Sequence, residues 1–572
     1  MERGEERNRG SRADHLFIVF FGGSVVLLII FITILASVPP VSKDALVHHL
    51  AIPKLYLKHG GIYEIPFMPF SYYPMNLDLL YLVPLYFGND IIPKFMHFSF
   101  ALLTGWLLFG YLRRRLNTTY ALLGAILFLS IPVIVKLSIT VYVDLGLVFF
   151  STAALLLVLK WLERGFSPKY LFFSAVFSGL AMGTKYNGMV AFFLLSLFVP
   201  FMYSRFAQDE KGRFFKSIGY GLLFVVIGLL VFSPWVIRNY AWTNNPVFPL
   251  YDHWFNPQKG EVKKSIGIFA YRALMYGEPW WEIVLLPVRV FFEGKDGSPQ
   301  YFDGKLNPFL FFLPFFAFFQ TRRDPVRVRI EKKILLAYTV LFFAFALFGS
   351  GFRIRYIAPV IPALVILSVF GVRKMVEAIR KSGKGAFRST ALLAFLLMVT
   401  VSLGLNLRYI IGQYRYVAPF DYLTGRLSRD QYIARYRPEY RAMQYINRHL
   451  PTDALILFIF LGNRGYYCER RYLFDMQNNK STLQRIAESA EGYEDIAVGL
   501  KKMGVTHLFM HSGIFAKWAE ITFDEKRQEL LKGFFEKYAK LGYSQSGYTL
   551  YILSQIASPS APPFASTMSS SP

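Results

Sequence analysis

The segment LFIVFFGGSVVLLIIFITILASVPPVSKDALVHHL, residues 16–50, joins a long apolar run directly to a short charged one. The apolar part, Leu16–Val38, is long enough to cross a bilayer as a helix. It is too long for the hydrophobic region of a cleaved signal peptide and has no small-residue cleavage site, so it predicts a retained membrane span. Asp44 follows at the membrane boundary, where a carboxylate is costly unless it faces water, a cation or a reacting group.

Asp44 has two interpretations. Ser42 can cap a helix that runs toward Pro53, which places Asp44 in the first turn. There the helix dipole favours an ionised carboxylate, the state that a catalytic base requires. In the alternative, Asp44 only completes the helix start. We interpret Asp44 as the candidate catalytic base.

The composition indicates a polytopic membrane protein. The chain has 572 residues, of which 54% are hydrophobic and 18% aromatic, more than is usual in soluble domains. In a soluble chain a net charge of +26 would suggest nucleic-acid binding. Here the basic residues gather in short loops between apolar segments, as expected from membrane orientation. We therefore expect a lipid bilayer and no nucleic acid as partner. Cys468 is the only cysteine, which excludes an intramolecular disulfide.

Apolar segments predict about eleven membrane-spanning helices. They are residues 16–38, 91–112, 120–135, 142–159, 171–184, 189–206, 214–235, 308–319, 334–349, 357–372 and 390–410. Two further apolar segments, 45–58 and 73–87, are interrupted by prolines. They are typical of helices that lie at the membrane interface or line a cavity.

The basic loops predict the orientation. If the N-terminus is cytoplasmic, the long basic runs all fall on the cytoplasmic side. These runs are 113–115, 160–169, 211–216, 322–333 and 373–388. The segments that then face the exoplasm are the Asp44 loop, Asp144, the KYNG motif at 185–188, the loop 238–307, the FRIRY motif at 352–356 and everything after residue 410. The polar groups suited to chemistry therefore share one side.

The C-terminal region has the pattern of a small α/β domain. Strand-like runs at 454–462, 505–511 and 548–553 alternate with helical stretches at 439–449, 481–503 and 524–541. We therefore expect four parts. They are a cytoplasmic tail at 1–15, a membrane domain at 16–410, an exoplasmic α/β domain at 411–556 and a disordered tail at 557–572.

The chain resembles the GT-C superfamily of polytopic glycosyltransferases. It is similar to bacterial relatives of the dolichyl-phosphate-mannose protein mannosyltransferases and of the aminoarabinose transferase of lipid A. The resemblance covers roughly residues 16–410. It depends on Asp44 after the first span and on YYPMNLDLLYLVPL (72–85), TVYVD (140–144), GLAMGTKYNG (179–188), SPWVIRNYAWTNNPVFPL (233–250) and RIRYIAPVIP (353–362).

The resemblance implies an activity and a location. The expected reaction transfers a sugar, with inversion, from a polyprenyl-phosphate donor to a lipid, glycan or protein acceptor on the exoplasmic face. Lipid A and core oligosaccharide are among the candidate acceptors. The expected location is a bacterial inner membrane, with a cytoplasmic N-terminus and a periplasmic C-terminal domain. The alternatives are a polytopic transporter and an envelope-assembly protein without transferase activity.

The resemblance also suggests site residues beside Asp44. Planar guanidinium groups stabilise a leaving phosphate well. Arg355 is therefore the first candidate for binding the donor phosphate, followed by Arg353 and Lys185. All three are also suited to extending toward lipid headgroups. Asp144 matches the place of a second carboxylate in relatives and equally suits a helix N-cap.

The remaining candidates are His48, His49, Arg238 and Asn239. Arg238 and Asn239 fit either donor binding or attachment of the long loop to the end of the span, and we favour attachment. Asp44 and His48 stand four residues apart and could in principle share a metal ion. Relatives that use lipid-monophosphate sugars resemble metal-independent enzymes, so we expect no catalytic metal and no other cofactor. The histidines are expected to form hydrogen bonds within the cavity or to the acceptor.

Overall fold

The computed structural model describes residues 2–207, 212–259, 266–347, 351–381, 385–477 and 480–554. The predicted tail at 557–572 lies outside them. The chain forms two compact units. The helical unit contains residues up to 65 and 69–429, and the C-terminal unit contains residues 66–68 and those from 430 onward.

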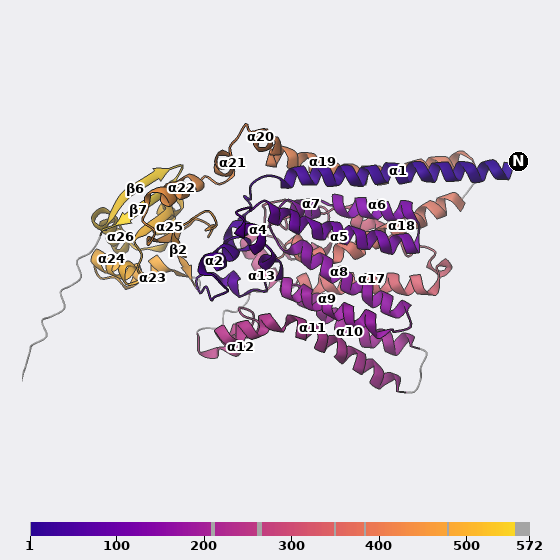
Figure 1. The fold of residues 1–572 in the computed structure, drawn as a ribbon, viewed down its shortest axis with the longest axis horizontal. Helices are drawn as coiled ribbons and strands as arrows, with labels where there is room; N and C mark the ends of the chain where they lie inside the picture. The colour runs from indigo at the N-terminus through magenta and orange to yellow at the C-terminus, as the bar shows by residue number, and fades with distance from the viewer. Residues whose placement is uncertain are drawn as a thin grey trace, which may run out of the picture. The chain divides into compact units, whose positions relative to one another are not determined.

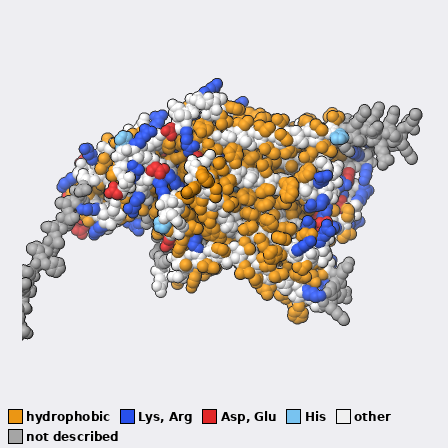
Figure 2. Space-filling model, in the orientation of Figure 1, with side chains coloured by type: hydrophobic (Ala, Val, Ile, Leu, Met, Phe, Trp, Pro, Cys, Tyr) orange, Lys and Arg blue, Asp and Glu red, His pale blue; other side chains and the backbone are white. Residues whose placement is uncertain are grey.

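The helical unit is a bundle of long helices (Figure 1). They are α1 (Glu2–Ala36), α5 (Ile92–Arg115), α6 (Thr118–Ser130), α7 (Pro132–Ser138), α8 (Asp144–Glu163), α9 (Pro168–Thr184), α10 (Gly188–Phe206), α11 (Arg213–Thr243), α16 (Phe309–Phe316), α17 (Val326–Leu347), α18 (Ile361–Lys381) and α19 (Ala386–Val417). Every one of the eleven predicted spans corresponds to helix. Figure 2 shows a broad hydrophobic surface over this bundle, as expected for a chain embedded in lipid.

The protein is a multi-pass membrane protein. Among the described residues, seven helices are long and apolar enough to span a membrane, and eight if the bent pair α6–α7 is one span. The difference from about eleven arises at α9, α16 and α17. α9 has 17 residues and α16 has eight, while α17 begins with the charged sequence VRVRIEKK. Length and charge therefore separate these three helices from the other spans.

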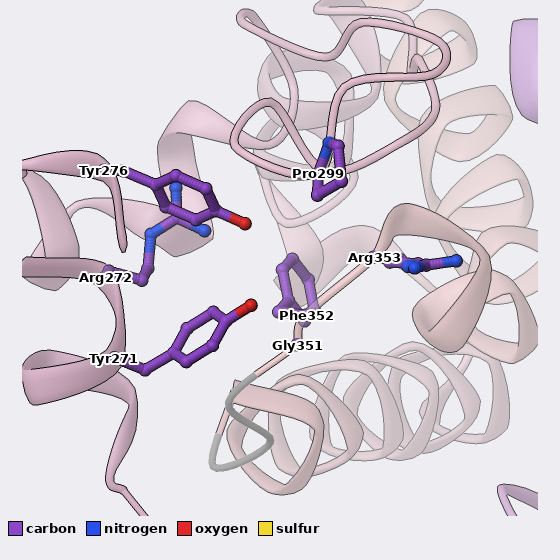
Figure 3. A pocket seen from close by; sticks show the side chains of 7 residues that line it. All are labelled: Tyr271, Arg272, Tyr276, Pro299, Gly351, Phe352 and Arg353. Carbon is purple, nitrogen blue, oxygen red and sulfur yellow. The ribbon is translucent and has the colours of Figure 1, made fainter. Parts of the chain in front are cut away.

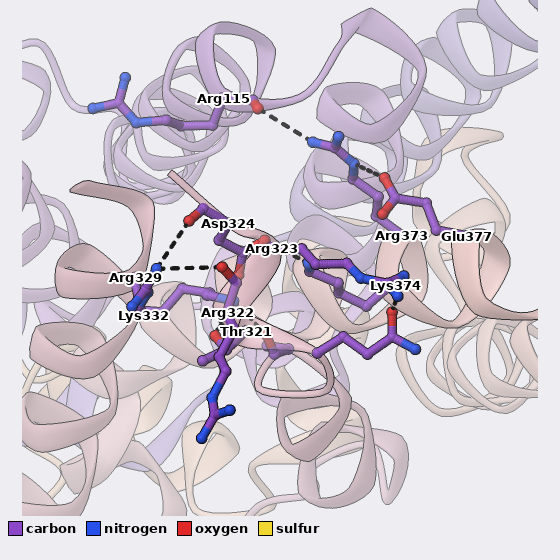
Figure 4. A network of polar contacts seen from close by, with 12 residues as sticks. Arg115, Thr321, Arg322, Arg323, Asp324, Arg329, Lys332, Arg373, Lys374 and Glu377 are labelled. Carbon is purple, nitrogen blue, oxygen red and sulfur yellow. Dashed lines mark hydrogen bonds and ion pairs between the residues drawn. The ribbon is translucent and has the colours of Figure 1, made fainter. Parts of the chain in front are cut away.

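Two charged residues near the start of α17, Glu331 and Lys332, are buried and form ion pairs, and Figure 4 shows the contacts around Lys332. Lys332 and Lys374 both bind the Asp324 carboxylate at 2.5 Å. Glu331 accepts two hydrogen bonds from Arg115, of 2.8 and 2.6 Å. Buried charges require such partners, so the network allows a charged segment to pack inside the bundle.

Short helices gather at the end of the bundle opposite the start of α1 (Figure 1). They include the π-helix η1 (Ala45–His49), α2 (Ala51–His59), α3 (Asn76–Leu80) and α4 (Leu82–Tyr86). The long loop adds α12 (Asp252–Phe255), α13 (Ile268–Tyr276), α14 (Trp280–Val284) and α15 (Leu286–Arg289). None of these is a span by length and composition. The proline-interrupted segments therefore form short helices, as predicted.

The C-terminal unit is an α/β fold with a five-stranded sheet of order β2–β1–β5–β7–β6. Its strands are β1 (Leu455–Ile459), β2 (Arg471–Phe474), β5 (His507–His511), β6 (Ala539–Gln545) and β7 (Tyr548–Leu553). Strand β1 pairs in parallel with β2 and β5, whereas β7 pairs antiparallel with β5 and β6. Its helices include α21 (Arg429–Tyr436), α22 (Tyr440–His449), α23 (Thr482–Ser489), α24 (Tyr493–Lys502), α25 (Ser512–Thr522) and α26 (Glu525–Tyr538).

The core of this unit lies between the sheet and its helices. Leu457, Leu508 and Met510 of the strands pack with Leu500 and Phe534 of the helices. The fold class predicted from the sequence, a helical membrane protein with a small α/β region, is confirmed. The predicted boundary at residue 410 falls within α19, which continues to Val417 and is followed by Pro419 in the short helix α20 (Pro419–Leu423).

Candidate active site

Asp44 lies immediately before η1, at the start of the loop that follows α1. Its backbone is helical and its side chain makes no capping hydrogen bond. The predicted cap by Ser42 is wrong, because Ser42 Oγ is buried and has no hydrogen-bond partner in the described part of the chain. The Asp44 carboxylate is therefore available for a different contact.

The helix also does not run uniformly toward Pro53. The N–H of Leu50 donates to the carbonyl of Ala45, a π-type bond, and the α-type bond from Lys54 to Leu50 then begins α2. Pro53 has no N–H, and its ring would collide with the carbonyl four residues earlier, so it is tolerated only in the first turn of a helix. The proline therefore separates η1 from α2, and π-turns of this kind often occur at functional sites.

The contact that Asp44 makes is an ion pair with Arg355. Arg355 Nη1 lies 2.7 Å from Asp44 Oδ2, and the two side chains are 11% and 19% exposed. Arg355 belongs to the 3₁₀ helix η5 (Ile354–Val360), and the N–H of Ile354 donates to the carbonyl of Phe302 at 2.9 Å. This backbone bond fixes the start of η5 and so places the guanidinium.

Arg355 also faces two aromatic rings. Its guanidinium lies 5.2 Å from the Tyr142 ring centroid and 5.7 Å from that of Tyr356. Its Nε is buried without a hydrogen-bond partner among the described residues. The cation is thus held by one carboxylate and two rings, and its Nε–H is still unused.

Burial acts to raise the pKa of the Asp44 carboxyl, because it disfavours the charged form. The attraction of Arg355, with smaller contributions from His48 and His49, outweighs burial and holds the pKa below its usual range. Asp44 is therefore ionised at neutral pH. While it remains paired with Arg355, however, it is a weak base.

A second ion pair lies beside the first. Asp144, the first residue of α8, is fully buried, and its Oδ1 lies 2.7 Å from Lys185 Nζ. Asp144 Oδ2 has no hydrogen-bond partner within the described residues. Lys185 Nζ is 5.6 Å from the Tyr356 ring centroid, so this ring lies near the cations of both pairs. Asp144 makes no side-chain cap for α8, whose N-cap is Val143.

His49 makes a third buried contact, with Asp78 of α3. Asp78 Oδ1 lies 2.7 Å from His49 Nδ1, and the side chains are 4% and 7% exposed. Burial lowers the pKa of His49 to about 3, and the charges of Asp44, Lys185, Asp144 and Arg355 also act on its ring. The imidazole is therefore within electrostatic reach of both ion pairs.

His48 lies against the same group of residues. Its ring stacks on Phe70 at 4.3 Å between centroids and lies 4.0 Å from the His49 ring. Its Nδ1 is buried without a partner in the described part of the chain. Burial is also the main cause that lowers the pKa of His48, so the ring is neutral at pH 7.

Two glycines allow α3 to approach the bundle closely. A Cβ at Gly146 of α8 would lie 2.4 Å from Leu77 Cδ2, and one at Gly183 of α9 would lie 2.3 Å from Asn76 Nδ2. Either methyl group would force the neighbouring side chain to move. The GLAMGTKYNG segment thus seats α3, which carries Asp78, beside Lys185.

Arg238 and Asn239 fix the loop instead of facing the ion pairs. Arg238 Nη2 donates to the carbonyls of Tyr72 and Tyr73 at 2.7 and 3.2 Å. Asn239 Nδ2 donates to the Tyr72 carbonyl at 2.8 Å and to the Tyr186 hydroxyl at 3.0 Å. These contacts favour the attachment role for both residues.

Arg353 is separate from Arg355. Its Nη1 lies 3.5 Å from Asp303 Oδ2, and the side chain is 33% exposed. Arg353 borders a small pocket, which is also lined by Tyr271, Arg272, Tyr276, Pro299, Gly351 and Phe352. Its guanidinium points away from that pocket (Figure 3). The structure therefore does not bring Arg353 into contact with Asp44.

The site includes residues that the sequence analysis did not single out, namely Asp78, Tyr142 and Tyr356. An available signal for Asp78 is that it is the one carboxylate in the apolar segment 72–85. As for metals, no group of three His, Cys, Asp or Glu side chains within the described residues could hold an ion. The absence of a catalytic metal stays a prediction.

The chain is similar to known membrane glycosyltransferases. Residues 89–237, which include Asp144 and Lys185, match the family described as dolichyl-phosphate-mannose-protein mannosyltransferase. No curated protein sequence matches the chain significantly.

Solved structures with a similar fold cover nearly the whole chain. ArnT from Cupriavidus metallidurans in the apo state matches with a TM-score of 0.54 and 15% identity over 94% of this chain and 98% of that chain. Its structure bound to undecaprenyl phosphate matches with a TM-score of 0.53 and 16% identity over 93% and 97%. The oligosaccharyltransferase AglB from Archaeoglobus fulgidus, in complex with an inhibitory peptide and a dolichol-phosphate, matches with a TM-score of 0.51 and 12% identity over 94% and 74%.

At these identities the structural likeness concerns the fold. Together with the family match, it confirms the resemblance predicted from the sequence: the chain has the GT-C fold of polytopic glycosyltransferases related to ArnT and the protein mannosyltransferases.

Proposed function

We propose that the protein is an inverting glycosyltransferase that moves a sugar from a polyprenyl-phosphate donor to an acceptor hydroxyl. The observation that carries the proposal is the pairing of Asp44 with Arg355, beside the pair of Asp144 with Lys185. Two carboxylates and two cations held in a poorly hydrated site provide both a base and a binding site for an anion.

Arg355 and Lys185 hold the donor phosphate. The unused Nε–H of Arg355 and the Nη2 amino group beside it form the side-on fork of the guanidinium, which suits two oxygens of one phosphate group. Lys185 adds a second positive charge near the Tyr356 ring, which Arg355 also faces. The similarity to ArnT bound to undecaprenyl phosphate and to AglB bound to a dolichol-phosphate supports a polyprenyl phosphate as the carrier.

Asp44 takes the proton of the acceptor. The acceptor oxygen forms a bond to the anomeric carbon while the bond from that carbon to the phosphate oxygen breaks, and the electron pair leaves with the phosphate. The proton moves to Asp44, and the sugar inverts because attack and departure occur on opposite faces. One base is sufficient for a single displacement of this kind.

The donor phosphate competes with Asp44 for Arg355. When the guanidinium turns to the phosphate, the carboxylate loses the partner that holds its pKa low. Asp44 then becomes a stronger base only after the donor has bound. Because donor binding comes first, Asp44 is a weak base as long as no donor is bound.

The proposed location is a bacterial inner membrane with the site on the exoplasmic face. The basic loops support a cytoplasmic N-terminus. Figure 2 is consistent with that orientation, because Lys and Arg side chains gather at the end of the bundle where α1 begins. The C-terminal unit is then periplasmic.

The acceptor is a lipid, a glycan or a protein of the cell envelope. We propose no catalytic metal, because Arg355 and Lys185 supply the positive charge that the leaving phosphate requires. A transporter would move a solute unchanged, and an envelope-assembly protein would leave the donor intact. These two alternatives are outcomes of the following test.

The test is release of undecaprenyl phosphate in proteoliposomes. Purified protein is supplied with a panel of undecaprenyl-phosphate sugars and with extracted envelope lipids and glycans as acceptors. We expect donor consumption by the wild type and little by Asp44→Asn. Lys43→Gln is a matched control, because Lys43 is the exposed neighbour of Asp44. An intact donor across the panel, with solute uptake or without it, would contradict the transferase.

A further inference from the structure

The contact between Asp78 and His49 has a consequence for the site. It joins the loop after α1 to α3 through a 2.7 Å hydrogen bond between residues 29 positions apart. Asp78 is itself seated by its helix. Asn76 Oδ1 accepts a hydrogen bond of 2.8 Å from Trp235 Nε1, and Leu77 packs against Gly146. The carboxyl therefore has little freedom to leave His49.

The number of protons that this pair binds determines whether His49 Nε2 is a hydrogen-bond donor or an acceptor for a ligand. Burial raises the pKa of Asp78 to about 8 and lowers that of His49 to about 3, so the pair is neutral overall at pH 7. In one neutral form, the carboxylic acid donates to Nδ1 and the ring hydrogen is on Nε2. In the other, a carboxylate accepts from Nδ1–H of an imidazolium, which also carries hydrogen on Nε2. An acid O–H pointing elsewhere would need a second acceptor to avoid a buried unsatisfied donor.

Both neutral forms therefore place a hydrogen-bond donor on Nε2. If the pair loses its proton, Asp78 becomes a carboxylate that accepts from Nδ1–H, and Nε2 presents a lone pair instead. That change would be unfavourable opposite an anion. Whether His49 Nε2 donates or accepts a hydrogen bond therefore depends on whether Asp78 is protonated.

The groups around the pair are those of the phosphate site. His49 or Asp78 is affected electrostatically by the charged residues of both ion pairs and by His48, namely Asp44, Arg355, Asp144, Lys185 and His48. The Tyr142 ring lies 5.5 Å from the His49 ring. Asp78 is also within electrostatic reach of Tyr56 and Tyr81. The charges of the two ion pairs balance each other. An incoming phosphate would add a negative charge, which a neutral N–H donor helps to stabilise.

We propose that Asp78 is a positioning residue: by binding His49 Nδ1 it keeps a hydrogen on Nε2, which donates to the phosphate of the polyprenyl donor. This inference rests on the proposed function, because it assumes that the phosphate lies between Arg355 and His49. It assigns no proton transfer to Asp78, which acts only through His49.

The experiment measures binding of undecaprenyl phosphate to the full-length protein in nanodiscs between pH 6 and pH 10. We compare the wild type with Asp78→Asn, whose amide N–H can donate to Nδ1 and does not ionise. Asp453→Asn makes the same chemical change at an exposed residue of the C-terminal unit. The ionisation of the ligand itself is common to all three proteins.

In the wild type and in Asp453→Asn we expect the affinity to fall about tenfold between pH 7 and pH 9.5, with a midpoint near 8, as a hydrogen bond to a charged group is lost. In Asp78→Asn the affinity should stay within about threefold over that range. An equal alkaline loss in Asp78→Asn would overturn the positioning role. Failure of the wild type to bind undecaprenyl phosphate at any pH would instead overturn the proposed function.

A second measurement does not depend on any ligand. Histidine ring nitrogens labelled with ¹⁵N report which nitrogen carries hydrogen, and the His49 signals are identified by their loss in His49→Gln. At pH 7 we expect hydrogen on Nε2 in the wild type and in Asp78→Asn, and at pH 9.5 only in Asp78→Asn. Hydrogen on Nδ1 alone in the wild type at pH 7 would contradict the proposal.

Discussion

Arg355 Nη1 lies 2.7 Å from Asp44 Oδ2, although the two residues come from opposite ends of the membrane domain. The candidate base and the candidate phosphate-binding group therefore neutralise each other before any donor is bound. A phosphate that takes Arg355 changes the charge balance of Asp44 at the same moment. This relationship links donor binding to base strength, and it gives the substitutions below distinct expected results.

Asp44→Asn removes the basicity of the side chain and keeps its shape. We expect sugar transfer to fall by roughly 10²- to 10⁴-fold, the usual effect of losing a general base. Binding of undecaprenyl phosphate should be at least as tight as in the wild type, because Arg355 no longer has a competing carboxylate. A fully active Asn variant would mean that the reaction does not require a base at this position.

Arg355→Ala should weaken undecaprenyl-phosphate binding by about 10- to 150-fold, which corresponds to roughly 1.5–3 kcal/mol for a hydrogen bond to a charged group. Arg355→Lys should recover only part of the affinity, because an ammonium lacks the planar fork. Arg353→Ala is the comparison, and we expect a smaller effect because Arg353 pairs with Asp303. Equal effects of the two alanine variants would argue against a specific role of Arg355.

Lys185→Ala should destabilise the protein, because it leaves the Asp144 carboxylate buried without its cation. We expect a loss of about 3–5 kcal/mol, the usual cost of leaving a buried charge without its partner. The double variant Asp144→Asn with Lys185→Met should recover part of that loss, since no charge is then stranded. Thermal unfolding in detergent measures both. A double variant less stable than Lys185→Ala would show that the pair is not coupled in this way.

The orientation can be tested by cysteine labelling. The native Cys468 is buried and is a poor reporter, so it is first replaced by Ser. Lys517→Cys and Arg164→Cys then place thiols at exposed positions in the C-terminal unit and between α8 and α9. An impermeant reagent added to spheroplasts should label the first variant and not the second. The reverse pattern would invert the proposed topology.

Asp78 should make the stability depend on pH. Its pKa is raised from 3.8 to about 8 by burial, so the folded state binds this proton more tightly than the unfolded state. The resulting stability is fully present below pH 3.8 and is lost as the pH rises through about 8. Asp78→Asn should therefore show a smaller fall in unfolding temperature between pH 6 and pH 9 than the wild type. Identical falls would mean that Asp78 is already ionised at pH 6.

The sequence predicted the helical segments well because hydrophobic length is a local property. The helices α9, α16 and α17 correspond to three of these segments, but their lengths and charges do not by themselves decide whether they cross the membrane. α17 illustrates the reason. Its buried residues Glu331 and Lys332 have charged partners that include Arg115 and Lys374, which come from distant parts of the chain. Pairs between distant segments are not visible in a local pattern.

The main carboxylates and cations of the site could be predicted from the sequence, but the ion pairs that they form could not. Asp44, Asp144, Lys185 and Arg355 were identified as candidates, yet no local pattern indicates that Asp44 binds Arg355 or that Asp144 binds Lys185. Asp78 was missed because its effect depends on His49, which reaches it only through the fold.

In the C-terminal unit, the apolar strands β1, β5 and β7 were predicted, whereas β2 and β6 were not. Strand β2 is short and β6 has mostly polar, exposed side chains. Such edge strands have little hydrophobic signal, and their pairing partners define them.

The π-turn before α2 means that the direction of the Asp44 side chain depends on Pro53, which lies in the next helix. One extra residue per turn rotates everything N-terminal to Leu50 by about 100° relative to α2. Pro53 maintains that offset simply by lacking an N–H. A change at this proline could therefore turn the carboxylate away from Arg355 without altering the chemical identity of any residue of the site. Mutational scans that score only direct contacts would overlook such a position.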